Sequence, residues 1–294
     1  MQFVILSRWA HLYSTQSLFL AAKRAGHYTE ILDYASINTY VTAGGIEHVY
    51  DGDKLPKVDG VIGRISPIYT PLGSALLDQF AHAGAFVSPS VPALKLARDK
   101  WQTLTALRQA SIPIPDSAMV SDLNYLPEAV ARLGGYPVVV KLLQSTHGEG
   151  VTLAHSEAQA YELLESYAAL NTGVMLQRYV AESGGADVRA FVVGGEVVAS
   201  MLRTPQAGEF RSNLHRGGSA SVTTLTTEEL EVATASAKTV GLGIAGVDFL
   251  RSNAGPLVME VNASPGLEGI EMTTGIDVAG TVVRYLETEI AKRR

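Results

Sequence analysis

The stretch AGVDFLRSNAGPLVMEVNASPGLEGIE, residues 245–271, contains two apolar runs separated by a short polar turn. This pattern predicts strands at 244–250 and 257–261, with the polar residues between them forming a hairpin loop. Two acidic residues, Asp248 and Glu260, interrupt these otherwise apolar strands. Acidic residues at such positions are more informative than acidic residues in a loop, because a strand interior normally buries its side chains.

The predicted hairpin brings three oxygen-bearing side chains to one patch of sheet. If the turn centres on Ala254, Asp248 lies opposite Glu260, and alternation along the strand puts Asn262 on the same face as Glu260. Facing carboxylates repel each other unless a cation lies between them, and Mg²⁺ favours a few carboxylates combined with substrate phosphates. We therefore expect Asp248, Glu260 and Asn262 to bind a divalent metal. The alternative is that they are strand-end residues solvated separately.

Composition excludes several classes of protein. The 294 residues are 47% hydrophobic and 18% charged, which is typical of a globular chain that forms two or three packed units. The net charge of −6 argues against a general nucleic-acid binder. The absence of cysteine rules out disulfides, thiolate metal sites and cysteine nucleophiles. A local basic site for an anion remains open.

No apolar run approaches the roughly 20 residues of a membrane span. The first residues, MQFVILSRWA, contain four consecutive apolar positions with no basic region before them, which does not match a signal peptide. We expect a soluble, cytoplasmic protein that has no membrane partner.

The first part of the chain, residues 1–92, alternates between strands and helices and predicts a parallel sheet. Its expected strands are 3–6, 29–32, 58–65 and 85–87, its helices are 14–25 and 71–84, and a small hairpin surrounds 47–53. Residues 88–92 are interpreted as a linker.

Two further units are expected, at 93–180 and 181–294. The central one contains helices at 94–110 and 156–170 and strands at 137–143, 150–154 and 174–180. The last one contains a hairpin of 189–193 and 197–203, a helix from 227 to about 240 capped by Thr226 or Thr227, the hairpin described above and a closing helix at 277–292.

Two common nucleotide-binding motifs are not supported. Residues 241–246, GLGIAG, match the dinucleotide fingerprint, but a helix precedes them and a strand follows, which is the reverse of the required order. The chain has no P-loop sequence. We therefore interpret these glycines as helix termination and close packing.

Two other segments suggest phosphate chemistry. Lys141 ends an apolar strand, and the loop after it contains Gly148 and Gly150, whose backbone N–H groups could face phosphate oxygens. Arg203 and Arg211, with Asn213, could neutralise a transferring phosphoryl group. The alternatives are an ordinary strand–loop–strand turn and a solvated loop.

With these segments in place, the sequence resembles the ATP-grasp superfamily and, within it, the RimK-type α-L-glutamate ligases. The matching segments are ILSR (5–8), LARDK (96–100), VVKLL (139–143), EFRSNLHRGG (209–218), AGVDFLR (245–251) and PLVMEVNASPGLEGIE (256–271). The resemblance extends over nearly the whole chain. It implies an α/β ATP-grasp fold with an N-terminal parallel-sheet domain, a central domain and a mostly antiparallel C-terminal domain, with ATP between the last two.

The resemblance also implies roles for individual residues. For the nucleotide, it implies phosphate contacts by Lys100, Lys141, Gly148 and Gly150, backbone contacts to adenine by Gln177, Arg178, Tyr179 and Val180, and a ribose contact by Asp187. Further nucleotide contacts are implied for Arg211, Ser212 and Asn213, and catalytic roles for Arg203, Arg211 and Asn213. Metal binding is implied for Asp248, Glu260 and Asn262. Arg178 replaces an acidic residue of the family pattern, Glu149 places a carboxylate in the phosphate loop, and the residues after ILSR are less polar than the pattern.

The implied reaction is ATP-dependent amide formation through an acyl phosphate, with Mg²⁺ or Mn²⁺, often two ions, bound at the metal site. The implied partners are L-glutamate and the C-terminus of an acceptor protein or polyglutamate chain, such as a small-subunit ribosomal protein, in a homo-oligomer, commonly a tetramer. Arg64, Arg216 and Arg8 are candidates for holding an anionic substrate. The alternatives are a ligase for another amino acid or small peptide, and an inactive nucleotide-binding module.

Overall fold

The computed structural model describes residues 1–143, 150–168, 173–214 and 217–294. Its first layer is a four-stranded sheet, the N-terminal sheet, made of β1 (Gln2–Leu6), β2 (Tyr28–Leu32), β6 (Gly60–Gly63) and β7 (Phe86–Ser88). The strands run parallel in the order β2-β1-β6-β7, which confirms the parallel sheet predicted from the sequence.

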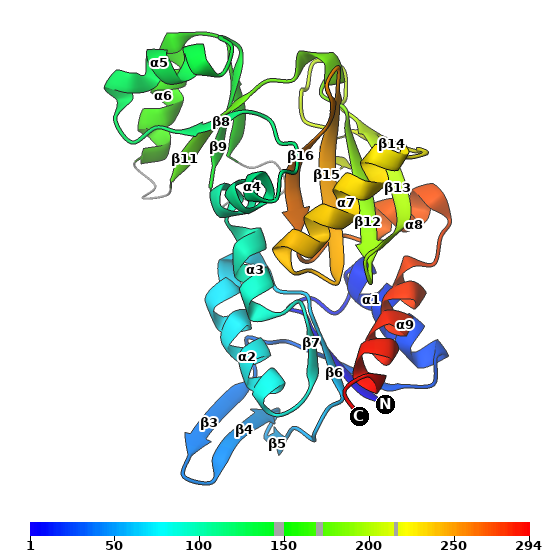
Figure 1. Cartoon of the computed structure of the whole chain (residues 1–294). Coiled ribbons are helices and arrows are strands. Elements are labelled where there is room, and N and C mark those ends of the chain that lie inside the picture. The colour runs from blue at the N-terminus through cyan, green and yellow to red at the C-terminus, as the bar shows by residue number, and fades with distance from the viewer. Residues whose placement is uncertain (144–149, 169–172, 215–216) are drawn as a thin grey trace.

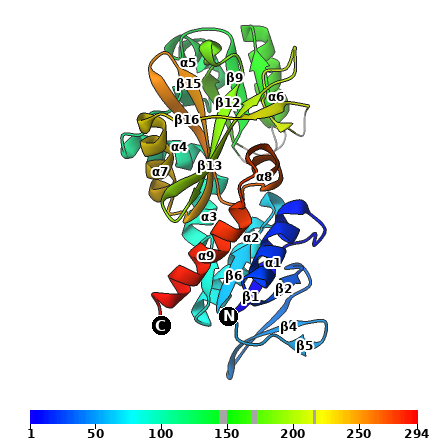
Figure 2. The same ribbon diagram turned by 90° about the vertical axis from the view of Figure 1, so that its right-hand side faces the viewer.

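Helices cover both faces of the N-terminal sheet because its buried strands alternate their side chains between two cores. Phe3 and Ile5 pack with α1 (Tyr13–Arg24), whereas Val4 and Leu6 pack with α2 (Thr70–His82), which follows a short 3₁₀ turn at Pro67–Tyr69. The last helix, α9 (Val278–Ala291), returns to lie beside α1 (Figure 2). Residues from the two ends of the chain therefore share one core.

A small antiparallel sheet projects from the bottom of the molecule in Figure 1. It is made of β3 (Asn38–Thr42), β4 (Gly45–Tyr50) and β5 (Asp53–Lys54). The hairpin predicted around residues 47–53 corresponds to β4 and β5, and β3 is an additional strand that the sequence pattern did not indicate. β3 is mostly exposed, so it lacks the apolar alternation that marks a buried strand.

The predicted single helix at 94–110 is wrong, and within the predicted linker at 88–92 only Pro89 and Ser90 lie outside a strand or helix. Helix α3 (Val91–Arg98) begins three residues after β7, with Pro92 in its first turn, where proline is tolerated. Asp99 then adopts an extended backbone, and its carboxylate accepts a hydrogen bond from the Gln102 amide (2.9 Å) at the start of α4 (Lys100–Gln109). Arg98 is therefore the last residue of α3 and Lys100 the first residue of α4, with the capping residue Asp99 between them.

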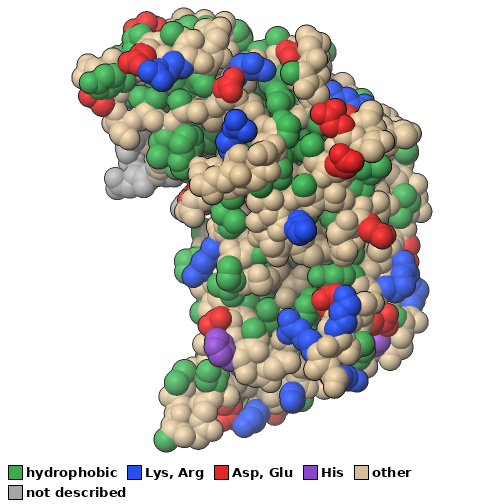
Figure 3. All heavy atoms as spheres, viewed as in Figure 1, with side chains coloured by type: hydrophobic (Ala, Val, Ile, Leu, Met, Phe, Trp, Pro, Cys, Tyr) green, Lys and Arg blue, Asp and Glu red, His purple; other side chains and the backbone are tan. Residues whose placement is uncertain are grey.

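The central sheet has the order β10-β9-β11-β8 and is antiparallel. Its strands are β8 (Ser117–Met119), β9 (Val138–Leu142), β10 (Val151–Ala154) and β11 (Val174–Arg178), and its helices are α5 (Leu126–Arg132), after a 3₁₀ turn at Leu123–Tyr125, and α6 (Glu157–Ala168). The helices pack on one face over Val138, Val140 and Leu176. Figure 3 shows the outline of the molecule indented below this part, which overhangs the rest.

The C-terminal sheet is also antiparallel, as expected for the last part of the chain, with the order β14-β13-β12-β15-β16. Its strands are β12 (Asp187–Val193), β13 (Glu196–Thr204), β14 (Ser219–Val222), β15 (Ile244–Ser252) and β16 (Gly255–Asn262), and a 3₁₀ turn at Ala181–Ser183 precedes them. Helix α7 (Thr227–Val240) covers one face and α8 (Glu268–Thr274) lies at the other (Figure 1). Thr226 caps α7, in agreement with the sequence prediction.

The register of the last hairpin differs from the prediction near the turn. The strands run to Ser252 and Gly255, so the turn contains two residues and is not centred on Ala254. A β-bulge then shifts the pairing by one residue, between Asp248 and Phe249 on β15, and this shift restores Asp248 to its place opposite Glu260. The predicted pairing of the two acidic residues is therefore confirmed, although for a different geometric reason.

None of the helices in the described ranges combines the length and apolarity needed to cross a bilayer. On the face drawn in Figure 3, cationic and anionic side chains are interspersed.

Candidate active site

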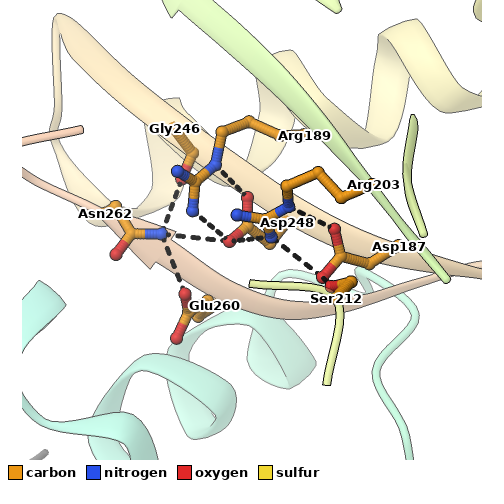
Figure 4. Close-up of polar contacts among 8 residues, drawn as sticks. All are labelled: Asp187, Arg189, Arg203, Ser212, Gly246, Asp248, Glu260 and Asn262. Atoms are coloured by element: carbon orange, nitrogen blue, oxygen red, sulfur yellow. Dashed lines mark hydrogen bonds and ion pairs between the residues drawn. The ribbon is translucent and has the colours of Figure 1, made fainter. Parts of the chain in front are cut away.

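A network of buried charges lies on one face of the C-terminal sheet (Figure 4). Asp187 on β12 pairs in register with Arg203 on β13, and the Arg203 Nε and Nη2 atoms donate to the two oxygens of Asp187 (2.6 and 2.8 Å). Arg203 Nη2 also donates to Asp248 Oδ2 (2.9 Å) on β15. One guanidinium therefore joins two carboxylates from strands far apart in the sequence.

Arg189 belongs to the same network and was missed in the sequence analysis. It lies directly opposite Asp248 in the β12–β15 register, and its Nε donates to Asp248 Oδ1 (2.7 Å). The available signal was an arginine in the buried run VRAFVV, two residues from Asp187 and therefore on the same face. An arginine in such a strand requires an anionic partner, which the sequence alone could not identify.

Asp248 and Arg203 are held in their charged forms by each other and by their neighbours. Burial would raise the pKa of Asp248, but the positive charges of Arg189 and Arg203 outweigh this effect and hold the pKa below its usual range. Burial likewise opposes the charge on Arg203, yet Asp248 and Asp187 raise its pKa above the ordinary value. The network is thus a fixed arrangement of charge in a site that excludes water, which is where preorganised charge acts most strongly.

Glu260 and Asn262 extend the network along β16. The Asn262 Nδ2 atom lies 3.1 Å from Glu260 Oε1 and 3.4 Å from both Asp248 Oδ2 and the Gly246 carbonyl oxygen. The set offers carboxylate and amide oxygens, which are ligands suited to Mg²⁺. Asp248 Oδ1 accepts from Arg189 Nε, and Asp248 Oδ2 accepts from Arg189 Nη2 (2.5 Å) and Arg203 Nη2 (2.9 Å). The oxygens of Glu260 and Asn262 therefore fit a divalent cation that substrate phosphates also bind, and Asp248 would share its carboxylate between that cation and the two arginines.

No group of three or more acidic, histidine or cysteine side chains in the described ranges forms a protein-only metal cluster.

Lys141 faces this patch from the end of β9. Its Nζ donates to Gln177 Oε1 (2.6 Å) on β11, and Gln177 Nε2 donates to Ser117 Oγ (3.0 Å) on β8. Burial lowers the pKa of Lys141 to about 8, with the negative charge of Glu260 opposing that shift and the positive charge of Lys100 adding to it. Burial also lowers the pKa of Lys100, which begins α4. Two ammonium groups and Glu260 therefore meet between the central and C-terminal sheets.

Arg211, which was predicted to share a role with Arg203, contacts a different set of residues. Its Nε and Nη2 donate to the two oxygens of Glu209 (2.9 and 2.6 Å), and its Nη1 donates to the Val151 carbonyl (3.1 Å) on β10 of the central sheet. The next residue, Ser212, donates its hydroxyl to Asp187 Oδ2 (2.5 Å). Arg211 thus ties the C-terminal sheet to the central one.

The remaining predicted residues lie around the same region. Arg178 ends β11 and directs its guanidinium toward Asp116 Oδ2 (3.6 Å), Tyr179 and the buried Val180 follow it, and Asn213 follows Ser212. Gly150 has a φ of +64°, and a Cβ there would lie 2.4 Å from Leu142 Cδ1, so this position requires glycine. Gly148, Glu149 and Arg216 lie outside the described residues.

The glycines at 241–246 have the structural role that was expected. Gly241 is the left-handed cap of α7 (φ +78°), and a Cβ on Gly243 would lie 1.9 Å from the Tyr285 hydroxyl. Strand β15 follows at Ile244, so no helix N-terminus is present to hold a pyrophosphate.

Comparison with known proteins relates this architecture to one family. Residues 1–94 match the model of the RimK PreATP-grasp domain, and residues 97–286 match the model of the RimK-like ATP-grasp domain. The chain is 46% identical to "Probable alpha-L-glutamate ligase 1" of Shewanella frigidimarina (strain NCIMB 400), over 99% of this chain and 96% of that protein. It is 44% identical to "Ribosomal protein bS6--L-glutamate ligase" of Shigella boydii serotype 4 (strain Sb227), over 98% and 96% of the two chains.

Solved structures show the same fold. The ATP-grasp ligase PsnB, complexed with a phosphomimetic variant of its minimal precursor, Mg and ADP, superposes with a TM-score of 0.75 at 20% identity and covers 98% of each chain. A RimK domain ATP-grasp protein from Sphaerobacter thermophilus DSM 20745 superposes with a TM-score of 0.74 at 21% identity, over 97% of this chain and 99% of that one. At these identities the likeness concerns the fold alone.

Proposed function

Because the chain belongs to the RimK family of ATP-grasp ligases, we propose that it uses ATP to join L-glutamate, through an amide bond, to the C-terminal carboxylate of a protein or polyglutamate chain. A small-subunit ribosomal protein is the proposed acceptor, since several relatives carry that activity in their names. The proposed enzyme is a homo-oligomer, a tetramer by resemblance, which light scattering would test.

The observation that carries this proposal is that positively and negatively charged side chains lie close together between the central and C-terminal sheets. Lys141 and Lys100 supply cations for phosphates, and Arg203 is held rigidly by Asp187 and Asp248 beside Glu260. Phosphoryl transfer needs positioning and charge neutralisation more than a covalent nucleophile, and this site offers both.

The proposed position of the nucleotide is based on this geometry. ATP would lie between the two sheets, with its phosphates near Lys141 and Lys100 and its adenine against the backbone after β11, at Gln177 to Val180. Asp187 is 5% exposed and engaged with Arg203 and Ser212, so its main proposed role is to orient Arg203, with one oxygen still able to accept from a ribose hydroxyl. Arg211, with Ser212 and Asn213, would help to close the site over the nucleotide.

The proposed reaction has two steps. The acceptor carboxylate attacks the γ-phosphorus of ATP, which releases ADP and leaves an acyl phosphate; Arg203 neutralises the charge on the transferring group. The amine of glutamate then attacks the acyl carbon, phosphate leaves, and the amine loses a proton. Mg²⁺ or Mn²⁺ ions, two by resemblance, would be held by Asp248, Glu260 and Asn262 and would neutralise phosphate charge.

Incubation with ATP, Mg²⁺ and each amino acid in turn, followed by mass spectrometry of candidate acceptor peptides, tests this function. We expect a ladder of products spaced by glutamate residues, with ADP formed in proportion. A ladder with another amino acid would replace glutamate in the proposal, and nucleotide binding without any product would indicate an inactive module.

Lys141 gives a prediction about protonation. Its pKa of about 8 means that near pH 8.5 most of the Lys141 population is neutral, and binding phosphates nearby should raise that pKa. ATP binding at about pH 8.5 should therefore take up about three quarters of a proton, and almost none at about pH 6.5. Calorimetry in two buffers of different ionisation enthalpy measures the uptake. The K141M variant should bind ATP more weakly and lose the part of the uptake that belongs to Lys141, while Lys100, whose pKa burial also lowers, can keep a share. An unchanged uptake would assign it to another group.

A further inference from the structure

Two arginines follow the carboxyl ends of neighbouring strands in the N-terminal sheet. Arg8 comes shortly after β1 and Arg64 directly after β6. Helices α1 and α2, which follow these strands, pack on opposite faces, so the crossover direction reverses between β1 and β6. In open parallel sheets, ligands bind outside the carboxyl ends of the strands at such a switch point. The topology of the N-terminal sheet therefore favours a ligand-binding site at this edge.

The arginines here differ in how they are neutralised. Arg8 is close to a carboxylate, with its Nε 3.1 Å from Asp33 Oδ1. Arg64 and Arg98, by contrast, form no ion pair with an acidic side chain in the described part of the chain, and each donates to a backbone carbonyl: Arg64 Nη1 to Pro265 (2.6 Å) and Arg98 Nη2 to Ile65 (2.5 Å). The Nε atom of Arg98 is buried and has no hydrogen-bond partner among the described residues.

Arg64 and Arg98 are also close to each other, because Arg98 bonds the carbonyl of the residue after Arg64. Burial lowers the pKa of Arg64 to about 10, and the positive charge of Arg98 adds to this effect. Burial lowers the pKa of Arg98 as well, with only partial compensation from Tyr34 and Glu260. Two half-buried cations without a carboxylate partner among the described residues are unfavourable on their own, and an anion between them would relieve that cost.

The pair borders the candidate active site. The Pro265 carbonyl that Arg64 contacts lies three residues after Asn262, and Ser264 Oγ donates to the Gly63 carbonyl (3.1 Å) next to Arg64. The charge of Glu260 acts on Arg98, as it does on Lys100 and Lys141. An anion bound here would thus lie beside the candidate active site, at the edge of the N-terminal sheet.

We propose that Arg64 and Arg98 bind a carboxylate of the incoming amino acid. This inference rests on the proposed function and names the residues that hold its second substrate. Glutamate keeps both carboxylates throughout the reaction, so a permanent cationic anchor suits it, whereas the acceptor carboxylate loses its charge when it is phosphorylated. A guanidinium pair can bind a carboxylate in the planar, bidentate geometry that a lysine cannot offer.

Steady-state kinetics of R64Q and R98Q test the proposal. Each variant should raise the KM for glutamate by roughly tenfold to a hundredfold, while the KM values for ATP and for the acceptor change by less than about twofold. R132Q is the matched control, because Arg132 pairs with Glu128 on an exposed helix, and it should leave all three values unchanged. A rise in the KM for ATP or acceptor, with the KM for glutamate unchanged, would overturn the assignment.

Two additional measurements distinguish a variant that fails to fold from one that has lost the anion site. R64K and R98K keep the charge and should give intermediate KM values for glutamate, so they replace any glutamine variant that fails to fold. Calorimetric titration with glutarate, a dicarboxylate without an amine, should show binding to the wild type and its loss in R64Q. If the wild type binds glutarate through the pair but forms no glutamate product, the proposed function fails and the anion site stands. If glutamate is ligated but neither variant changes its KM, the anion site fails alone.

Discussion

Replacing Glu260 by glutamine should slow ligation at limiting Mg²⁺ by about 4 kcal/mol in transition-state free energy, or roughly a thousandfold in rate. Glutamine keeps the size of the side chain and an oxygen that can accept from Asn262 Nδ2, but it removes the charge that a divalent cation requires. The fold should survive. The measurement is the rate of ADP formation as a function of Mg²⁺ concentration, with partial rescue expected at high Mg²⁺.

E231Q is the control for this variant, since Glu231 is exposed on α7 and has no proposed role in the site. It should match the wild type at every Mg²⁺ concentration. Normal turnover of E260Q at limiting Mg²⁺ would show that Glu260 is not a metal ligand.

Replacing Arg203 by methionine should lower the free energy of unfolding by about 3–5 kcal/mol, because it leaves two buried carboxylates without their shared cation. Asp187 would keep only the Ser212 hydroxyl among its present side-chain partners, and Asp248 would keep Arg189. Chemical denaturation at neutral pH measures the loss. The double variant R203M/D187N should recover part of it, since it removes the carboxylate charge that R203M leaves without a cation.

The pH dependence of this loss has a definite sign. Arg189 and Arg203 hold the pKa of Asp248 below its usual value, so the folded state gains stability from this group above the pKa of an unfolded aspartate and loses it as the pH falls. The difference in unfolding free energy between wild type and R203M should therefore shrink in acid. A difference that stays constant from neutral pH to about pH 3 would contradict the charge-based account of the network.

The sequence predicted the face-to-face acidic pair, because period-two alternation and one turn constrain a hairpin strongly. It could not predict the β-bulge, which shifts the register by one residue and whose presence depends on the neighbouring strand as much as on the hairpin itself. The confirmed pairing of Asp248 with Glu260 therefore combines a turn that was placed incorrectly with a bulge that compensates for it.

Contacts between segments that are distant in the sequence were harder to predict. Arg189 was overlooked because its partner Asp248 is 59 positions away and is brought opposite it by the pairing of β12 with β15. Arg98 entered the sequence analysis only within the segment LARDK, since the break at Asp99 that separates α3 from α4 is a local capping event within an otherwise helical pattern. The parallel N-terminal sheet was easier, because its strands and helices alternate regularly.

The central claim is that the site activates a carboxylate by phosphorylation and passes it to the amine of glutamate. An acceptor peptide labelled with ¹⁸O in its C-terminal carboxylate, incubated with ATP, Mg²⁺ and glutamate, tests this claim most directly. The account predicts that one ¹⁸O atom appears in inorganic phosphate for each glutamate amide first formed on the labelled carboxylate. Amide product accompanied by unlabelled phosphate would contradict it, because the acceptor oxygen would then never have been bonded to phosphorus.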